Sequence, residues 1–495
     1  MRISELLSEA RVTPLALLDA EVSSLSQDSR SLQPGALFVC NPGTINDSHA
    51  YLEAAKASGA SAAVVWSASG FQEAKRVGLP AFQLHEERVH FNDAICRICN
   101  TFYGYPTRNM KVVGVTGTNG KTTTAWLIRD MLAALGLKSG YLGTLGFQLP
   151  DEDRELGNTT PFPVELWSLL AEARDNGVEA MAMEVSSHAL AEHRSEYVEF
   201  DVGVFTNLTQ DHLDFHGSME EYEAAKGRLF LELPQQTSKA FRGALNMDDT
   251  AAASLSHNLG HAAVRYWTQD CEYDIGIGKR SVAVDSIQAE LCAGSERIEV
   301  TVRLGGDYNV ENLISATSGV IALGYNLSDL KEAIEQVRPV PGRFEAVSSD
   351  TGIGVLVDYA HTPDALEKLL DAVRPLTKGR VITVFGCGGD RDRTKRPKMA
   401  RAASERSDIT VVTSDNPRTE DPQSILDEVL TGIVAGRESV DIIDRCEAIK
   451  HAVKLARPGD VVVIAGKGHE NYQIIGRTKY PMDDRVMARE ALEAR

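Results

Sequence analysis

Residues 112–124 read Val112-Val113-Gly114-Val115-Thr116-Gly117-Thr118-Asn119-Gly120-Lys121-Thr122-Thr123-Thr124. A β-branched apolar run enters a loop of glycines and small polar residues, and residues 125–132 then carry apolar side chains at helical spacing. This pattern predicts a strand, a loop and a helix. A glycine-rich loop at a helix N-terminus directs backbone N–H groups and the positive end of the helix dipole at one point, which favours an anion.

Two side chains at the start of the predicted helix indicate that this anion is a nucleotide triphosphate. Lys121 supplies a cation for the outer phosphates, and the Thr122 hydroxyl can hold Mg²⁺. The stretch departs from the strict G-x-x-x-x-G-K-[ST] pattern because residue 115 is valine, so an ordinary strand-to-helix turn is the alternative. We therefore take as candidate ATP-binding residues Gly117, Thr118, Asn119, Gly120, Lys121, Thr122 and Thr123.

Length and charge limit the class of protein. A chain of 495 residues suggests about three domains, at about 150 residues each. The net charge of −19 argues against a nucleic-acid or membrane-surface binder, because both partners are polyanions. The sequence has no apolar run of transmembrane length and no signal-peptide core after Met1, so we expect a cytoplasmic protein.

The seven cysteines are scattered along the chain. Only Cys96 and Cys99 are closely spaced, and no second pair completes a zinc site. We interpret these two as thiols on a helix, and Cys387 as a small residue after a strand.

Two interruptions of the periodic pattern divide the chain into domains at 1–106, 107–337 and 338–495. Pro106 marks the first boundary, and residues 337–343, with two prolines and a glycine, mark the second. The first domain is predicted to be a small α/β unit. The central domain alternates strands and helices and has a β-rich segment at 260–304, which we interpret as an inserted antiparallel patch.

The third domain has the most regular pattern. Strands are predicted at 353–358, 380–385, 408–413, 439–443 and 460–465, separated by helices at about 364–374, 397–405, 423–435 and 446–456. Such alternation predicts right-handed crossovers and a Rossmann-like, doubly wound parallel sheet. The fold class is therefore three-domain α/β, with ligands expected at the carboxyl ends of the strands.

Two strand ends in the central domain carry polar groups that suit a metal. Glu184 ends one predicted strand, and His212 follows the next, so both are expected at the same sheet edge as Thr122. A carboxylate, an imidazole and a hydroxyl beside a triphosphate fit Mg²⁺. The alternatives are a solvated Glu184 and a His212 that caps the following helix.

A further helix is predicted after Ser218, which can cap it with Glu221 closing the capping box. Lys226 lies on this helix, and from the pattern alone it is a solvated lysine.

Several motifs occur together and in order over essentially the whole chain: Thr116–Thr123, Asn158-Thr159-Thr160-Pro161, Glu184–His188, Thr206–Asp214, Tyr222–Lys226, Asp358–Asp364 and Asp415-Asn416-Pro417-Arg418. This set resembles the Mur ligases, and among them the enzymes that add the third residue of the peptidoglycan stem. The nucleotide loop is also similar to that of the folylpolyglutamate synthetases.

The resemblance implies a two-step reaction. The γ-carboxylate of D-glutamate in UDP-MurNAc-L-Ala-D-Glu attacks the γ-phosphate of ATP, and an amine then displaces phosphate from the acyl phosphate. It also implies that Lys226 is carbamylated (N6-carboxylysine) and bridges to a second Mg²⁺, so Lys121, Glu184, His212 and Lys226 are the implied catalytic groups. His188 and His212 are both imperfect candidates for the general base.

The same resemblance implies the substrate contacts. UDP would face Ser29 and Thr44 of the first domain, and the muramoyl dipeptide would contact Asn158, Thr159, Thr160, Ser186 and Arg194. Glu192 stands where we expect glutamine, and a carboxylate there conflicts with an anionic substrate unless it turns to solvent. Implied ATP contacts from beyond the phosphate loop are Asn309, Arg343 and Asp358.

The amine is indicated by the motif Asp415-Asn416-Pro417-Arg418, which follows a strand end. Pro417 stiffens the loop, and the Arg418 guanidinium suits the distal carboxylate of meso-diaminopimelate, whereas it would repel the ammonium of L-lysine. Arg391 could hold another carboxylate, and Gly466 and Glu470 could receive the distal ammonium. Alternatives are the same ligase with L-lysine, a folylpolyglutamate synthetase-type ligase and an ATP-hydrolysing regulator. We expect a monomer.

Overall fold

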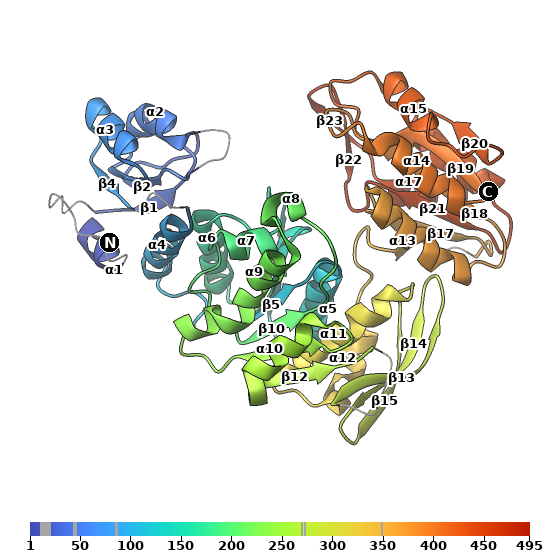
Figure 1. Cartoon of the computed structure of the whole chain (residues 1–495), viewed down its shortest axis with the longest axis horizontal. Helices are drawn as coiled ribbons and strands as arrows, with labels where there is room; N and C mark the ends of the chain where they lie inside the picture. Colours follow the sequence, from blue (N-terminus) through green and yellow to red (C-terminus); the bar gives the residue numbers. More distant parts are fainter. Residues whose placement is uncertain (10–20, 43–46, 85–87, 269–270, 272–273, 348–349) are drawn as a thin grey trace. The chain divides into compact units, whose positions relative to one another are not determined.

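The computed structural model describes residues 1–9, 21–42, 47–84, 88–268, 271, 274–347 and 350–495 (Figure 1). The chain forms two compact units, one of residues 1–266 with 315–326 and the other of residues 267–314 with 327–495. Each unit is described by itself below. The three-domain boundaries at 106 and 337 stay a prediction.

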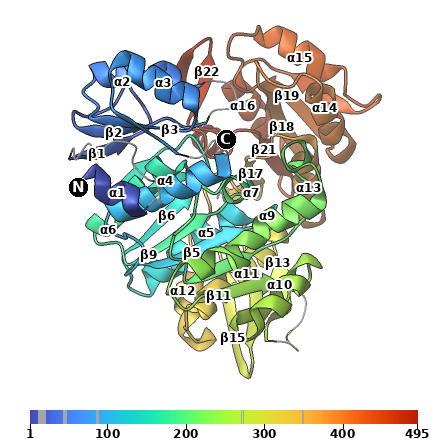
Figure 2. The ribbon, with the colours of Figure 1, turned by 60° about the vertical axis from the view of Figure 1, so that its left-hand side comes forward.

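The N-terminal part of the first unit is a small parallel sheet with the order β1-β2-β3-β4. The helices α2 and α3 lie on one face of this sheet, and α1 and α4 pack against the other (Figure 2). Every residue of β2 and β3 is buried, because the sheet is covered on both faces. The elements are α1 (Ile3–Glu9), β1 (Ser24–Ser26), β2 (Ala36–Val39), α2 (Leu52–Ala57), β3 (Ala62–Val65), α3 (Ala68–Val77), β4 (Ala81–Gln83) and α4 (Arg88–Phe102).

A larger sheet forms the rest of the first unit. Its strands β12-β11-β10-β5-β9-β6 are parallel, and β7 and β8 continue it antiparallel. The strands are β5 (Lys111–Thr116), β6 (Ser139–Gly143), β7 (Gly146–Leu149), β8 (Glu152–Arg154), β9 (Ala180–Glu184), β10 (Val202–Phe205), β11 (Arg242–Asn246) and β12 (Ala263–Tyr266). The helices are α5 (Lys121–Ala134), α6 (Pro163–Asp175), α7 (Ser187–Ala191), α8 (Leu213–His216), α9 (Met219–Leu231) and α10 (Ala251–Leu259).

The predicted antiparallel patch is confirmed in the second unit. The strands β13 (Ile275–Val282), β14 (Ile287–Ala293) and β15 (Glu296–Val302) form a meander, with a bulge between Ile277 and Arg280. A disulfide joins Cys271 to Cys292, a pairing that the sequence did not indicate. The patch is followed by α11 (Tyr308–Ala322) and α12 (Lys331–Glu335).

The doubly wound C-terminal sheet is also confirmed. Its order is β16-β17-β21-β18-β19-β20, and every pair except β16–β17 is parallel. The strands are β16 (Glu345–Ala346), β17 (Gly354–Asp358), β18 (Val381–Cys387), β19 (Ile409–Ser414), β20 (Glu438–Asp441) and β21 (Val461–Ala465). The helices are α13 (Pro363–Val373), α14 (Lys395–Arg406), α15 (Pro422–Leu430), α16 (Arg445–Leu455) and α17 (Asp484–Glu493), and β22 (Tyr472–Ile475) and β23 (Thr478–Pro481) form a hairpin.

Among the described residues, no helix is both long and apolar enough to cross a bilayer. Cys96 and Cys99 lie buried on α4, as the sequence predicted, and Cys387 is buried at the end of β18.

Candidate active site

The predicted nucleotide loop leaves the carboxyl end of β5 and enters α5. Gly117 has φ 148°, and a Cβ there would lie 1.9 Å from Thr206 Oγ1, so this position needs glycine. Residues after β10 hold the loop: Thr206 Oγ1 donates to the Asn119 carbonyl at 2.6 Å, and the Thr118 N–H donates to the Asn207 carbonyl at 2.8 Å. The loop is therefore fixed by its neighbouring strand before any ligand binds.

The missing glycine at position 115 has a structural reason. Val115 is buried inside β5 and pairs with Glu184 of β9 and Val204 of β10. A β-branched residue suits such a central strand, and the loop begins only after Thr116. The departure from the strict pattern thus falls in the sheet and leaves the phosphate-binding part intact.

Two lysines converge on the first carbonyl of the loop. Lys121 Nζ lies 3.0 Å and Lys226 Nζ 2.8 Å from the Gly117 oxygen. Lys226 is 1% exposed and lies over the Tyr222 ring at 4.3 Å, so the solvated interpretation of this lysine is wrong. Burial holds the pKa of Lys226 well below its usual range, and the positive charge of Lys121 lowers it further. Both causes favour the neutral form of this amine over the ammonium.

Glu184, which ends β9, accepts hydrogen bonds from three residues, and Thr144 donates through both its N–H and its Oγ1. Thr122 Oγ1 donates to its carboxylate at 3.0 Å, Tyr141 Oη at 2.5 Å and the Thr144 N–H at 2.8 Å. Glu184 is fully buried, so the solvated alternative is wrong. A hydroxyl and a carboxylate in contact at the phosphate loop form an oxygen donor set that suits Mg²⁺. The sequence missed Tyr141 and Thr144, whose contact with Glu184 depends on the pairing of β6 with β9.

His212 sits beside two further histidines. It occupies the N-cap position of α8 with φ 51°, but its side chain makes no capping hydrogen bond. Its ring is about half exposed and lies 4.8 Å, edge to face, from that of His188. His216 is buried with Nε2 3.0 Å from Ser187 Oγ, and burial, with His188 as the next cause, lowers its pKa to about 4. His216 therefore stays neutral at physiological pH, and the sequence gave no sign of its burial.

The residues predicted to hold the muramoyl dipeptide differ in what they contact. Thr160 is buried, donates to the Glu184 carbonyl at 2.9 Å and accepts from the Ser186 N–H at 3.0 Å, so it joins two loops. The Ser186 hydroxyl caps α7. Asn158 is exposed, and Thr159 Oγ1 lies 3.2 Å from Thr144 Oγ1.

Glu192 does not turn to solvent, which corrects one expectation. Its carboxylate is buried and accepts from Arg194 Nε at 2.7 Å, with a second contact from Nη2. Arg194 also lies over the Phe162 ring at 3.9 Å and donates to the Thr160 carbonyl at 3.3 Å. Glu192 thus compensates the charge of Arg194, and the guanidinium is oriented by the protein itself.

The predicted UDP contacts are only partly described. Ser29 is half-buried in the loop after β1, and its carbonyl accepts from Ser58 Oγ at 3.3 Å. Thr44 lies outside the described residues. Both stay predictions.

The predicted ATP contacts in the second unit are tightly held. Asn309 is buried, with Nδ2 donating to the Gly305 carbonyl at 2.7 Å. Asp358, at the end of β17, accepts from the N–H groups of Phe344 and Ala360 at 2.7 and 2.8 Å. Burial raises the pKa of Asp358, and the nearby Arg343 guanidinium opposes that shift.

The loop that carries Arg418 follows β19 and is fixed on both sides. The Arg418 N–H donates to the Ile474 carbonyl at 3.0 Å, and the Gly476 N–H donates to the Arg418 carbonyl at 2.7 Å. Arg418 has φ 52°, a conformation that is rare for a bulky residue and that concentrates at functional sites. Its Nη1 donates to the Gly389 carbonyl at 2.8 Å, so the guanidinium plane is set before a ligand arrives.

Asn416 connects this loop to the loop after β21. Its Nδ2 donates to Glu470 Oε2 at 2.9 Å, and its Oδ1 accepts from Lys467 Nζ at 3.0 Å. Lys467 is fully buried and also pairs with Glu470 at 2.8 Å, a contact that the sequence missed. Gly466 has φ 117°, and a Cβ there would lie 3.1 Å from Asp415 Oδ2. Asn416 therefore positions the loop, and Glu470 already has a cationic partner.

The other residues predicted at this site lie nearby. Pro417 is buried. A Cβ on Gly389 would lie only 1.9 Å from the Pro417 carbonyl oxygen, so glycine at this position allows the two loops to pack together. Arg391 is exposed in the loop after β18 and follows Asp390, whose φ is 53°.

A phosphate loop at the carboxyl edge of a parallel sheet, beside a buried lysine and carboxylate, defines a P-loop nucleotide-dependent enzyme. Residues 115–320 match the model of the Mur ligase middle domain, and residues 342–468 match that of the Mur ligase, glutamate ligase domain. The chain belongs to the Mur ligase family. It is an ATP-dependent ligase that forms amide bonds.

Named relatives align along the whole chain. The UDP-N-acetylmuramoyl-L-alanyl-D-glutamate–2,6-diaminopimelate ligase of Gloeobacter violaceus is 44% identical over 100% of this chain and 99% of its own length. The enzyme of the same name from Geobacillus thermodenitrificans is 42% identical over 96% of each chain. A solved structure of a ligase of that name is 30% identical, with a TM-score of 0.70 over 100% of this chain and 99% of that one.

Proposed function

We propose that this enzyme joins meso-2,6-diaminopimelate to the D-glutamate γ-carboxylate of UDP-MurNAc-L-Ala-D-Glu in peptidoglycan biosynthesis. The observation that carries the choice of amine is the guanidinium of Arg418, which the Gly389 carbonyl and the β22 backbone hold in one orientation. The names of the 42–44% identical relatives support the same substrates. We further propose that the enzyme acts as a monomer in the cytoplasm.

In the first step, the γ-carboxylate attacks the γ-phosphate of ATP and ADP leaves. The N–H groups of the loop and the N-terminus of α5 receive the phosphates, and Lys121 swings from the Gly117 and Thr118 carbonyls to the charge that develops on them. Since little covalent chemistry falls to the protein in phosphoryl transfer, its main contribution is to position and to neutralise charge.

Mg²⁺ would be held by Thr122 and Glu184, with His212 at the exposed side of the site. When bound, it offsets the negative charge of the phosphates and the acyl group. Lys226 fits the proposed carbamate, because burial lowers its pKa and so favours the neutral amine that takes up CO₂, and the product is an oxygen ligand of negative charge. That ligand would replace the hydrogen bond that Lys226 now makes to the Gly117 carbonyl.

In the second step, the amine attacks the acyl phosphate and phosphate leaves. The distal carboxylate of diaminopimelate would accept from Arg418, while Gly466 and Glu470, whose Oε2 already accepts from Asn416 and Lys467, would receive the distal ammonium. L-lysine brings only an ammonium to this position and would be repelled by Arg418. Arg391, in the neighbouring exposed loop, could receive the remaining carboxylate.

The test is a panel of amines with UDP-MurNAc-L-Ala-D-Glu and ATP, with the product identified by mass spectrometry. We expect the diaminopimelate adduct and phosphate release that requires both acceptor and amine. An L-lysine adduct formed faster would reject the assigned amine while keeping the ligase. Phosphate release without an acceptor would reject ligation in favour of an ATP-hydrolysing regulator, and activity on a folate acceptor would favour a folylpolyglutamate synthetase-type ligase.

A further inference from the structure

A group of two sulfurs and one carboxylate lies in the antiparallel patch, where the proposed reaction uses no residue. The ligand atoms of Cys271, Glu290 and Cys292 all lie within 4.8 Å of one another. Cys292 is fully buried, and the other two side chains are half-buried. Once the disulfide is reduced, two thiolates and a carboxylate supply ligand types that Zn²⁺ binds, and three protein ligands leave its fourth position to water.

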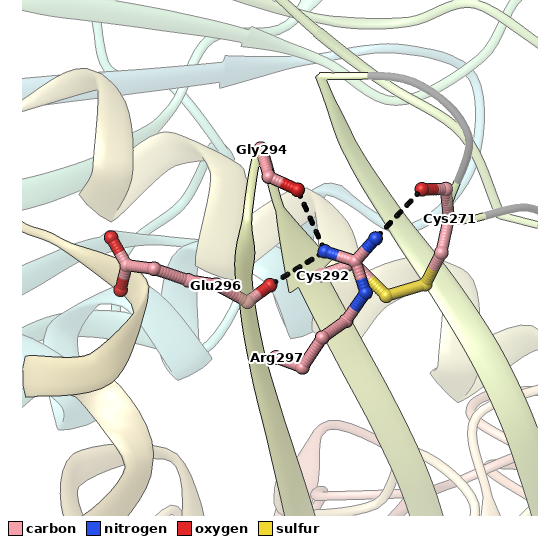
Figure 3. The surroundings of a disulfide bond; sticks show 5 residues. All are labelled: Cys271, Cys292, Gly294, Glu296 and Arg297. Atoms are coloured by element: carbon pink, nitrogen blue, oxygen red, sulfur yellow. Dashed lines mark hydrogen bonds between the residues drawn. A yellow bond between two sulfur atoms is a disulfide. The ribbon is translucent and has the colours of Figure 1, made fainter.

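The fold brings the two sulfurs together by backbone contacts as well as by the disulfide itself. Cys292 on β14 pairs with Arg297 on β15. The Arg297 guanidinium donates to the Cys271 carbonyl at 3.3 Å and to the carbonyls of Gly294 and Glu296 at 2.7 and 2.8 Å (Figure 3). Arg297 thus ties Cys271 to the β14–β15 turn, so the cysteines remain neighbours when both are thiols.

A glycine makes room for the carboxylate. A Cβ at Gly278 would lie 2.3 Å from Glu290 Oε2 and 3.3 Å from Cys271 Sγ. Gly278 lies within the bulge of β13, between Ile277 and Arg280, which interrupts the regular pairing opposite Glu290. Any side chain at position 278 would occupy the space between Glu290 Oε2 and Cys271 Sγ, so glycine there lets these two ligand atoms approach each other.

The carboxylate directly opposite Glu290 favours a cation at this position. Glu290 on β14 pairs with Glu299 on β15, and like charges directly opposite each other destabilise a sheet. Because side chains alternate along a strand, Glu290 and Cys292 share one face of β14. A divalent ion bound by Glu290 would offset the repulsion from Glu299, which is exposed and lies outside the ligand group.

We propose that the reduced pair Cys271 and Cys292, with Glu290, binds Zn²⁺, and that oxidation to the disulfide releases the ion. On binding, each thiol loses its proton to solvent and two Zn–S bonds form. On oxidation by a low-molecular-weight disulfide, the two protein sulfurs form one S–S bond, and the oxidant is reduced to two thiols. In the cytoplasm, where we propose that the enzyme works, the thiol form is favoured.

The test uses the full chain, reduced with a phosphine and freed of reductant without oxygen. Co²⁺ is titrated as a probe, and the thiolate-to-cobalt charge-transfer absorption is followed, because oxygen and nitrogen ligands at the nucleotide site do not give this band. We expect the band to saturate at a single equivalent and to disappear when Zn²⁺ is added. Absence of the band in reduced protein would overturn the proposal.

Variants assign the ligands. Cys271→Ser and Cys292→Ser should each abolish the band, and Glu290→Gln should weaken Co²⁺ binding at least about tenfold. The matched controls are Glu299→Gln and Cys446→Ser. Glu299→Gln removes the charge across the strand pair but no ligand, so it should weaken Co²⁺ binding clearly less than Glu290→Gln does, and Cys446→Ser, at a partly exposed free cysteine, should bind as the parent does. A band that survives in either of the first two variants, or equal losses in Glu290→Gln and Glu299→Gln, would reject this ligand set.

The last experiment tests whether oxidation of the two thiols prevents metal binding. Protein treated with oxidised glutathione should lose two hydrogens by intact mass, fail to give the cobalt band and regain it after reduction. A disulfide that resists the phosphine in the folded chain would mean a permanent structural link and would also overturn the proposal. Because every readout is metal binding or mass, failure here is independent of the proposed ligase activity.

Discussion

Replacement of Arg418 by alanine tests the proposed amine specificity most directly. The guanidinium is held by the Gly389 carbonyl at 2.8 Å, and the Arg418 backbone is bonded to Ile474 and Gly476 of the β22–β23 hairpin, so the side chain is already oriented for a ligand. Among the described residues, the hydrogen bonds of this side chain involve Nη1 alone. Nε and Nη2 can therefore serve the distal carboxylate of diaminopimelate.

The expected size of the effect follows from these contacts. A hydrogen bond between charged groups contributes about 1.5–3 kcal/mol, so loss of the fork should cost about 2 kcal/mol or more. At about 1.4 kcal/mol per tenfold, kcat/KM for diaminopimelate should fall about 30-fold or more. Arg418→Lys keeps the charge but loses the fork, so it should fall between the parent and Arg418→Ala.

The assay is phosphate release at saturating ATP and UDP-MurNAc-L-Ala-D-Glu with diaminopimelate varied. Arg401→Ala is the matched control, because Arg401 lies on the exposed face of α14 and pairs only at the surface with Glu405, at 3.0 Å. We expect its kcat/KM to equal that of the parent. An unchanged kcat/KM in Arg418→Ala, or a loss of equal size in the control, would refute the assignment of Arg418 to the distal carboxylate.

Four further predictions concern single residues. Lys226→Ala should be nearly inactive and partly rescued by short-chain carboxylates, and near-normal activity without rescue would exclude the carbamate. Glu184→Gln should raise the Mg²⁺ concentration needed for half-maximal rate about tenfold or more, whereas an unchanged Mg²⁺ dependence would remove Glu184 from the metal site. The pKa of His216 is about 4 in the folded chain and ordinarily 6.5, so the unfolded chain binds the proton first as pH falls. The free energy of unfolding should therefore drop between about pH 6.5 and pH 4, and in urea titrations His216→Asn should make that drop smaller. Asp484→Asn leaves Arg445, bonded to it at 2.7 and 2.8 Å, as a buried unpaired charge, and should lower the free energy of unfolding by about 3–5 kcal/mol; a loss under about 1 kcal/mol would show that the pair contributes little.

The sequence predicts the fold where local pattern and packing agree. The strand predicted at 380–385 is β18 (Val381–Cys387), and the helix predicted at 446–456 is α16 (Arg445–Leu455). Buried parallel strands are continuous apolar runs and the helices between them are amphipathic, so both periods are readable. The nucleotide loop is predictable for the same reason, since its glycines and Lys121 are contiguous.

Contacts that depend on a local chain reversal or on packing between segments could not be predicted. The ion pair of Glu192 and Arg194 depends on His193, whose φ of 56° reverses the chain so that two nearby side chains meet. Lys226 is buried because α9 packs against the phosphate loop, whereas its own helix pattern fits an exposed lysine equally well. Cys271 and Cys292 are 21 residues apart, and nothing in that spacing distinguishes them from the other cysteines.

The hydrogen bonds around Asn416 bear on how amine specificity can be altered. The Asn416 side chain is hydrogen-bonded to Lys467 and Glu470 of the loop after β21 and accepts from the Ile474 N–H of β22. In addition, Gly389 of the loop after β18 packs against Pro417. Transplanting the four residues Asp415–Arg418 alone into a related ligase would thus transfer the motif without the contacts that hold it in this conformation. The smallest graft that we expect to transfer the preference for diaminopimelate therefore also carries residues 388–391 and 466–476. For the same reason, resistance to an inhibitor that binds Arg418 should require changes in all three segments together.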